Sequence, residues 1–154
     1  MPARVVRPGA VLVSIAYAAV MVYLTLLVAF FGLAALHVFY GVTLLLDVER
    51  GYTTTITPTP LLYALALATA PLYLWHGYTS YTRGNKRALL IPPLIALAIA
   101  VVAVGVVAIG GAVATGFNCK ATCSCGVKSW SGPSVSLSPL SVSMGSCECY
   151  ACKP

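Results

Sequence analysis

One uncharged segment constrains this chain more than any other feature. From Gly9 to Leu46 no side chain carries a charge at neutral pH, and His37 is the only titratable group there besides the tyrosines. An α-helix rises about 1.5 Å per residue, so about 20 apolar residues cross a hydrocarbon core of about 30 Å. The segment is nearly twice that length. It therefore predicts a lipid-embedded helix that extends beyond the membrane.

Two other interpretations of this segment remain open. A break at residues 30–32 or 40–41 would divide it into a hairpin of two short spans, although neither is a strong turn signal. A cleaved signal peptide would explain the basic start and the small residues at 16–18, but the apolar stretch far exceeds the roughly 7–15 residues of a typical signal core. We expect residues 9–46 to form one helix, straight or kinked, that is retained in the mature chain.

Two more apolar runs follow, separated by polar segments. Residues 47–60 contain two prolines among threonines and are predicted to be a loop, because proline cannot continue a helix. Residues 61–78 form the second predicted span, and the aromatic residues at its end are typical of a membrane interface. Residues 79–87 form a basic loop, and residues 88–116 form the third span.

The basic residues indicate an orientation. Arg83, Lys86 and Arg87 form the densest basic cluster on a short loop, and cytoplasmic loops are enriched in such residues. We place this loop and the basic N-terminus, residues 1–8, in the cytoplasm, and residues 117–154 outside. The prediction is a multi-pass membrane protein with an extracytoplasmic C-terminus.

The composition excludes several classes of protein. Sixty per cent of the residues are apolar and 8% are charged, whereas globular domains carry about 25% charged residues. The net charge of +6 is dispersed along the chain, which disfavours nucleic-acid binding as a first choice. No carboxylate or lysine lies inside a predicted span, which disfavours an ion-coupled transporter. The use of Ala, Val, Leu and Tyr without Gln is compatible with a thermophilic source.

Glycines in the last apolar run suggest how the helices associate. Gly105, Gly110 and Gly111 lie among Ala and Val, and small residues let membrane helices approach closely. Glycine is also generally commoner in membrane helices, so both explanations stand. We predict a helix-packing face at these three positions.

The cysteines are confined to the C-terminal segment. Apolar residues alternate with serine between residues 135 and 144, which predicts half-buried strands with turns at 132–133 and 138–139. About 35 residues cannot bury enough apolar surface to fold unaided, so staples are expected. We predict structural disulfides, of which six cysteines allow about 15 pairings. The six are Cys119, Cys123, Cys125, Cys147, Cys149 and Cys152.

Other chemistry for these residues fits less well. The tight cysteine spacing could chelate a metal or an iron–sulfur cluster, but the usual pair of C-x-x-C knuckles is missing. Cys149 and Cys152 could act as a redox pair, although such pairs usually lie at a helix N-terminus. His37 and His76 could be haem ligands, but we expect them at different membrane depths. We predict no cofactor, no metal and no catalytic residue.

The layout of residues 61–115 resembles that of conjugative, type IV secretion pilins. An apolar helix at 61–78 and a second at 88–115 flank the basic turn Arg83-Gly-Asn-Lys-Arg87. Such pilins wait in the membrane and are then extracted into a helical filament with bound lipid. The resemblance implies that Arg83, Lys86 and Arg87 line the lumen and meet phosphates of lipid or transported DNA. The long first run and the cysteine-rich tail depart from the pilin pattern.

The sequence thus predicts an all-α transmembrane fold of about three helices, with a small disulfide-stapled β or irregular C-terminal segment. We expect a non-enzymatic structural subunit of a cell or virion envelope that contacts membrane lipid and forms a homo-oligomer or a larger membrane assembly. The alternatives are a conjugative-type pilin, with nucleic acid as a further partner, and a membrane thiol-disulfide oxidoreductase.

Overall fold

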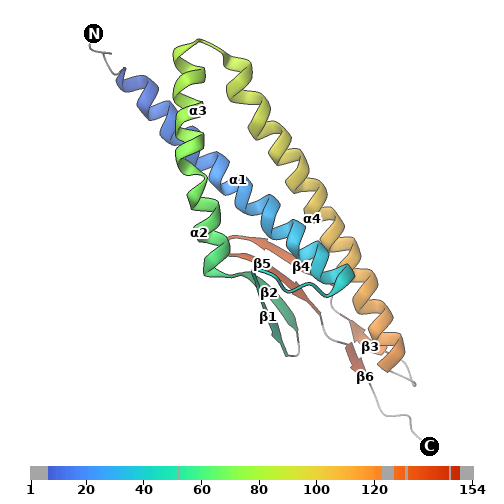
Figure 1. Cartoon of the computed structure of the whole chain (residues 1–154). Coiled ribbons are helices and arrows are strands. Elements are labelled where there is room, and N and C mark those ends of the chain that lie inside the picture. Colours follow the sequence, from blue (N-terminus) through green and yellow to red (C-terminus); the bar gives the residue numbers. More distant parts are fainter. Residues whose placement is uncertain (1–6, 52, 123–126, 131, 146, 150–154) are drawn as a thin grey trace, which may run out of the picture.

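The computed structural model describes residues 7–51, 53–122, 127–130, 132–145 and 147–149. This part of the chain is mostly helical, and it combines long apolar helices with a small antiparallel sheet, as predicted (Figure 1). The helices are α1 (Pro8–Tyr40), α2 (Pro60–Ala68), α3 (Ala70–Thr82) and α4 (Lys86–Thr122). The strands are β1 (Leu46–Arg50), β2 (Thr54–Pro58), β3 (Val127–Trp130), β4 (Ser134–Leu137), β5 (Leu140–Met144) and β6 (Cys147–Cys149).

The first apolar run is one helix with no break at residues 30–32. It begins with Pro8. Proline is favourable in the first turn because the N–H group that it lacks would have no partner within the helix there. It ends at Tyr40 and not at residue 46, because Gly41 takes a left-handed conformation with φ 70° and donates its N–H to the His37 carbonyl at 2.8 Å. Such a glycine is the usual end of a helix.

The second run is longer than the expected 61–78 and is divided into α2 and α3. The division falls at Thr69, two residues before Pro71, which has no N–H to continue the hydrogen-bonding pattern. The basic loop is correspondingly shorter than residues 79–87, because α3 continues to Thr82 and α4 already begins at Lys86. Gly84 turns the chain with φ 68°, and the Asn85 side chain accepts the Ala88 N–H at 3.2 Å.

Residues 47–60 differ from the predicted loop, because they form most of a β-hairpin, β1–β2. Thr54 and Ile56 favour extended backbone as β-branched residues, and Ile56 is completely buried beneath the helices. Pro58 stands at the end of its strand, where proline is tolerated. The proline content correctly excludes a helix here but does not exclude a strand.

The C-terminal segment completes the same sheet. β4 and β5 form a hairpin around the predicted turn at 138–139. The predicted alternation is present in β5, where Leu140 and Val142 are buried, but not in β4, where Leu137 is exposed. β5 also pairs with β2, so the strand order is β1-β2-β5-β4. β3 and β6 pair separately as a two-stranded sheet.

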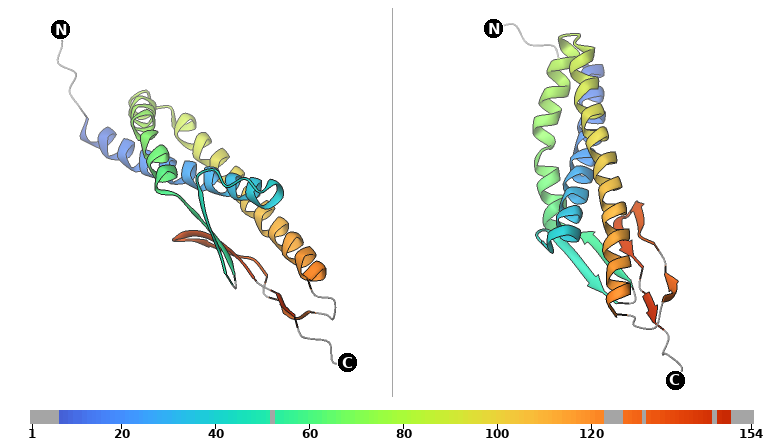
Figure 2. Two further views of the ribbon diagram at one scale, coloured as in Figure 1. Left: turned by 60° about the horizontal axis from the view of Figure 1, so that its bottom comes forward. Right: turned by 90° about the vertical axis from the view of Figure 1, so that its right-hand side faces the viewer.

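Helix α1 is the centre of the molecule. It contacts both α3 and α4 more extensively than these two contact each other, and Figure 2 shows it between the two outer rods. Phe30 and Phe31 are fully buried, with ring centroids 4.9 Å apart. Their cluster includes Ile56 of β2 and Val142 of β5, so one core joins the helices to the sheet.

The closest helix approach in this core predicts the effect of a substitution at Gly77. A Cβ atom there would lie 3.1 Å from the Ser14 Cα atom and 3.1 Å from the Tyr17 ring. Because a backbone atom cannot move aside cheaply, we expect Gly77→Val to lower the unfolding free energy by about 1–3 kcal/mol. Thermal unfolding in detergent measures this.

Gly105→Val is the matched control, because a Cβ atom at Gly105 has no described neighbour within 4 Å. Equal unfolding temperatures for the two variants would contradict the close approach of α1 and α3.

Candidate membrane-facing surface and disulfide-linked cap

Two of the described helices are long and apolar enough to cross a membrane, judged by length and composition alone. They are α1 and the part of α4 from Lys86 to Phe117. The 33 residues of α1 extend about 50 Å, well beyond the roughly 30 Å of a hydrocarbon core.

The α2–α3 rod has an exposed apolar surface along its length. Together with Thr69, its 9 and 13 helical residues extend about 34 Å, which is close to the thickness of a bilayer core. Its outward side chains are large and apolar, and each is more than half exposed. They include Leu61, Leu65, Leu67, Leu72 and Trp75.

Aromatic side chains are distributed along this rod. Tyr63 is in its first turn, Tyr73 and Trp75 are in the first half of α3, and Tyr78 and Tyr81 are near the α3–α4 turn. Tyr63 and Tyr81 are separated by about 27 Å of helix. Tyr63 also lines an apolar groove of about 480 Å³ together with Tyr23 of α1. The separation of Tyr63 from Tyr81 is close to the thickness of a hydrocarbon core, and tyrosine is enriched at both membrane interfaces.

The charged residues are divided between the ends of the bundle. Arg83, Lys86 and Arg87 are all exposed at the α3–α4 turn. Arg7 is near them, since a Cβ atom at Gly9 would lie 3.8 Å from the Tyr81 hydroxyl. The opposite end carries both signs: Asp47, Glu49 and Arg50 belong to β1, Glu148 to β6 and Lys128 to β3, and Lys120 is near the end of α4 (Figure 1).

Polar groups inside the helical bundle have hydrogen-bond partners. The Thr25 hydroxyl donates to the Met21 carbonyl at 2.8 Å, so the Tyr73 hydroxyl, 2.7 Å away, is left to donate to Thr25. His76 lies 3.0 Å from the Ala88 carbonyl and joins α3 to α4. No buried side-chain nitrogen or oxygen among the described residues lacks a partner. Polar groups in apolar surroundings need such hydrogen-bond partners, because burying them without a partner costs free energy.

The two histidines are far apart. His37 is in the last turn of α1 and lies 3.1 Å from the Val42 carbonyl, whereas His76 is near the α3–α4 turn. They lie toward opposite ends of the bundle, and each contacts a backbone carbonyl of its own.

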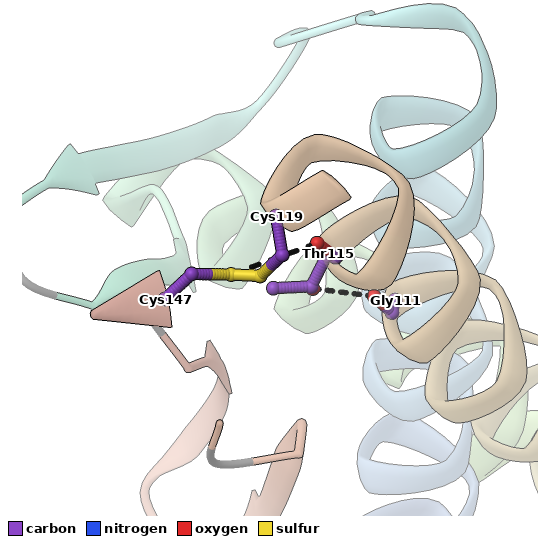
Figure 3. The surroundings of a disulfide bond; sticks show 4 residues. All are labelled: Gly111, Thr115, Cys119 and Cys147. Carbon is purple, nitrogen blue, oxygen red and sulfur yellow. Dashed lines mark hydrogen bonds between the residues drawn. A yellow bond between two sulfur atoms is a disulfide. The ribbon is translucent and has the colours of Figure 1, made fainter. Parts of the chain in front are cut away.

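A disulfide links α4 to the last strand of the described chain. Cys119 and Cys147 are paired, with Cα atoms 5.5 Å apart, a normal separation for a disulfide. Gly111, Thr115 and Cys119 are spaced by four residues and form one stripe of α4, which Figure 3 shows facing the bond. The Cys147 sulfur lies 3.9 Å from the Thr115 carbonyl oxygen.

The other cysteines are only partly placed. Cys123, Cys125 and Cys152 lie outside the described residues. Cys149 ends β6, where it pairs with Val127, and only its backbone is described.

The predicted packing glycines have different surroundings. A Cβ atom at Gly110 would lie 2.6 Å from the Phe39 ring of α1, and one at Gly111 would lie 3.5 Å from Pro133. Gly105 has no described neighbour within 4 Å of such an atom. Among the described glycines, Gly77 is the one at which an added Cβ atom would lie against the backbone of another helix, 3.1 Å from the Ser14 Cα atom, and the sequence did not predict it. The only signal for it is the small residues Ser14 and Ala18, spaced by four along α1.

The opposite side of α4 carries an unpaired apolar stripe. Ile109, Val113 and Phe117 are spaced by four residues and are 70%, 63% and 76% exposed. They lie on the lower part of α4, at the level where Gly111 would meet Met144 of the sheet. We call the two sheets, β1-β2-β5-β4 and β3-β6, the cap. The lower part of α4 therefore has one side against the cap and one apolar side that the described residues leave uncovered.

No family model matches the chain, and no curated protein or solved structure matches it. The function is therefore argued from the surfaces described above.

The disulfide predicts how the cap responds to reduction. Cys119 and Cys147 are 28 residues apart, and closing such a loop stabilises the folded state by about 3–4 kcal/mol. We expect Cys119→Ser with Cys147→Ser to lower the thermal unfolding midpoint and to expose residues 127–149 to proteolysis. Thr115→Val is the control, because its hydroxyl donates to Gly111 within α4.

Peptide mapping without reductant tests the pairing itself. A cross-linked peptide containing Cys119 and Cys147 is expected. A cross-link of either residue to a different cysteine would contradict the pairing.

Proposed function

We propose that this chain is a small multi-pass membrane subunit that acts by helix packing and association, with a disulfide-stapled cap on the extracytoplasmic side. The proposal is supported by three apolar rods, α1, α2–α3 and α4, with lipid-like outer surfaces. It is also supported by the grouping of Arg7, Arg83, Lys86 and Arg87 at one end, since such residues are enriched on the cytoplasmic side.

In this orientation the N-terminus is cytoplasmic and the sheet is outside. The α2–α3 rod then sets the thickness of the embedded layer, because it connects the basic turn to the hairpin β1–β2 directly. A span of the same length counted along α4 from Lys86 ends at about residue 108.

The apolar stripe of α4, formed by Ile109, Val113 and Phe117, is the observation that supports association. Ile109, Val113 and Phe117 lie beyond residue 108, where the proposed span ends. They continue the apolar surface on the side of α4 that the described cap residues leave uncovered. Exposing such side chains to water is unfavourable by about 25 cal/mol per Å² of apolar surface, and contiguous patches of this kind mark interaction sites. We propose that other copies of the chain cover the stripe in a homo-oligomer or a larger envelope assembly.

This proposal predicts that polar residues in the stripe disrupt association. We expect Ile109→Ser with Val113→Ser to weaken self-association at least tenfold, or by about 1.4 kcal/mol. Cross-linking in membranes and light scattering in detergent measure the change. The fold is expected to persist, because both side chains point away from the core.

Val101→Ser is the matched control, since Val101 is 64% exposed on the same helix but lies inside the proposed span. A wild-type chain that remains monomeric in its own membrane would rule out the stripe as a self-association surface.

A conjugative-type pilin is a more specific version of the same proposal. It is favoured by the antiparallel pair α3 and α4, which are joined by a three-residue turn with Arg83, Lys86 and Arg87 exposed around it. In this version the three basic residues contact phosphates of lipid or transported nucleic acid, an interaction that weakens with added salt.

The pilin version predicts lipid-containing filaments. Electron microscopy of the sheared cell-surface fraction is expected to show them, and Arg83→Gln with Arg87→Gln is expected to reduce their number without changing the amount of chain in the membrane. Membrane particles without filaments would argue against this version and leave the association proposal standing.

A further inference from the structure

We propose that the turn between β4 and β5 rests on the outer lipid surface of the membrane and inserts its apolar residues between the headgroups. This inference rests on the proposed membrane orientation. It starts from a contact between segments 114 residues apart, in which the Tyr23 hydroxyl donates to the Leu137 carbonyl at 3.2 Å. Tyr23 is near the middle of α1, so the turn reaches far up the side of the bundle.

The contact lies beside an apolar groove that runs along α1 and the α2–α3 rod, from Tyr63 to Leu74 on the rod. Tyr23 and Tyr63 line the same apolar groove, and Tyr63 lies in the first turn of α2, where the embedded rod begins. Tyrosine favours the boundary between acyl chains and headgroups because its ring is apolar and its hydroxyl is polar. Tyr23 and Tyr63 are both partly exposed, and in this inference Leu137, which is bonded to Tyr23, lies at that boundary.

The end of the sheet at this level is apolar. Leu46 pairs with Pro58, and Leu137 pairs with Leu140, at the ends of the two hairpins. The pairing of Ile56 with Val142 places these two pairs at the same end of the strands. Glu49 and Arg50 are paired with Thr55 and Thr54 toward the other end. The sheet thus directs an uncharged row of residues toward the membrane; the exposed Asp47 follows one residue behind this row, and Glu49 and Arg50 lie toward the far end.

The turn itself has the exposure expected of a lipid contact. Leu140 is buried, but Leu137 is 51% exposed, and Ser138 and Pro139 are exposed beside it. The turn contains no charged residue, so insertion carries no charge-burial cost. Its exposed surface is continuous, through Tyr23 and Tyr63, with the apolar surface of α1 and α2 that contacts lipid in the proposed orientation. A phospholipid layer is the occupant that this continuity favours.

Tryptophan fluorescence in liposomes tests the position of the turn. The reporter Leu137→Trp is introduced into the full chain with Trp75→Phe and Trp130→Phe, and the lipid is phosphatidylcholine brominated either near the headgroup or near the end of the acyl chain. We expect a loss of emission that is greater with the bromine near the headgroup. Ser138→Trp is a second reporter, should Leu137→Trp fail to fold.

Two control positions separate the possible failures. Leu94→Trp reports on the proposed span, where Leu94 is 62% exposed, and is expected to be quenched. Ser143→Trp reports on the face of the sheet opposite the buried Val142 and is expected to be unaffected. Quenching of Leu94→Trp without quenching at the turn would overturn this inference alone. No quenching at Leu94 would overturn the membrane proposal as well, and strongest quenching of the turn by the deep bromine would place it too far inside the bilayer for this inference.

Discussion

The structure depends on the burial of Phe30 and Phe31 where the helices meet the sheet. The two rings are completely buried and in edge-to-face contact, a favourable arrangement for aromatic pairs. Ile56 and Val142 bring β2 and β5 into the same core, and Val107 brings α4. Four short strands have too little apolar surface to be stable alone. The sheet therefore depends for its stability on the helices that it packs against, which are α1, α2 and α4.

This arrangement explains why one helix is so much longer than a membrane is thick. The upper half of α1 packs against α3 through the close contact at Gly77, and the lower half forms the base for the cap. The lower part of α4 likewise has two different sides. Gly111, Thr115 and Cys119 face the cap, and Ile109, Val113 and Phe117 face away from it. A single helix thus carries both a stapled side and an apolar side available for association.

Much of the helical framework could be predicted from the sequence because it is encoded locally. The absence of charge from Gly9 onward and the prolines near residue 60 act within a few residues of the feature they determine, whereas the end of α1 at Gly41 was expected at residue 46. The alternation around the 138–139 turn is equally local. The hairpin β1–β2 was missed because prolines and threonines are as compatible with an irregular loop as with an edge of a sheet.

The long-range features could not be predicted in the same way. Nothing near Thr54 indicates that it will stand opposite Met144, and nothing near Gly77 indicates that Ser14 will lie against it. The pairing of Cys119 with Cys147 was one of many that cysteine spacing allowed. The close contact at Gly77 requires the crossing point of two helices, which depends on the sum of their side-chain contacts and not on any one motif.

The pairing of β2 with β5 has a consequence for the order in which the protein is made. The first hairpin leaves the ribosome well before its partner strand, since Thr54 and Met144 are 90 residues apart in the chain (144 − 54 = 90). During that interval one edge of β2 has unpaired backbone groups, and such an edge readily pairs with other chains. In the proposed membrane orientation, this edge has to be sheltered until α4 has been inserted and β5 has emerged on the same side, so translocation of the C-terminal segment would itself be a folding step.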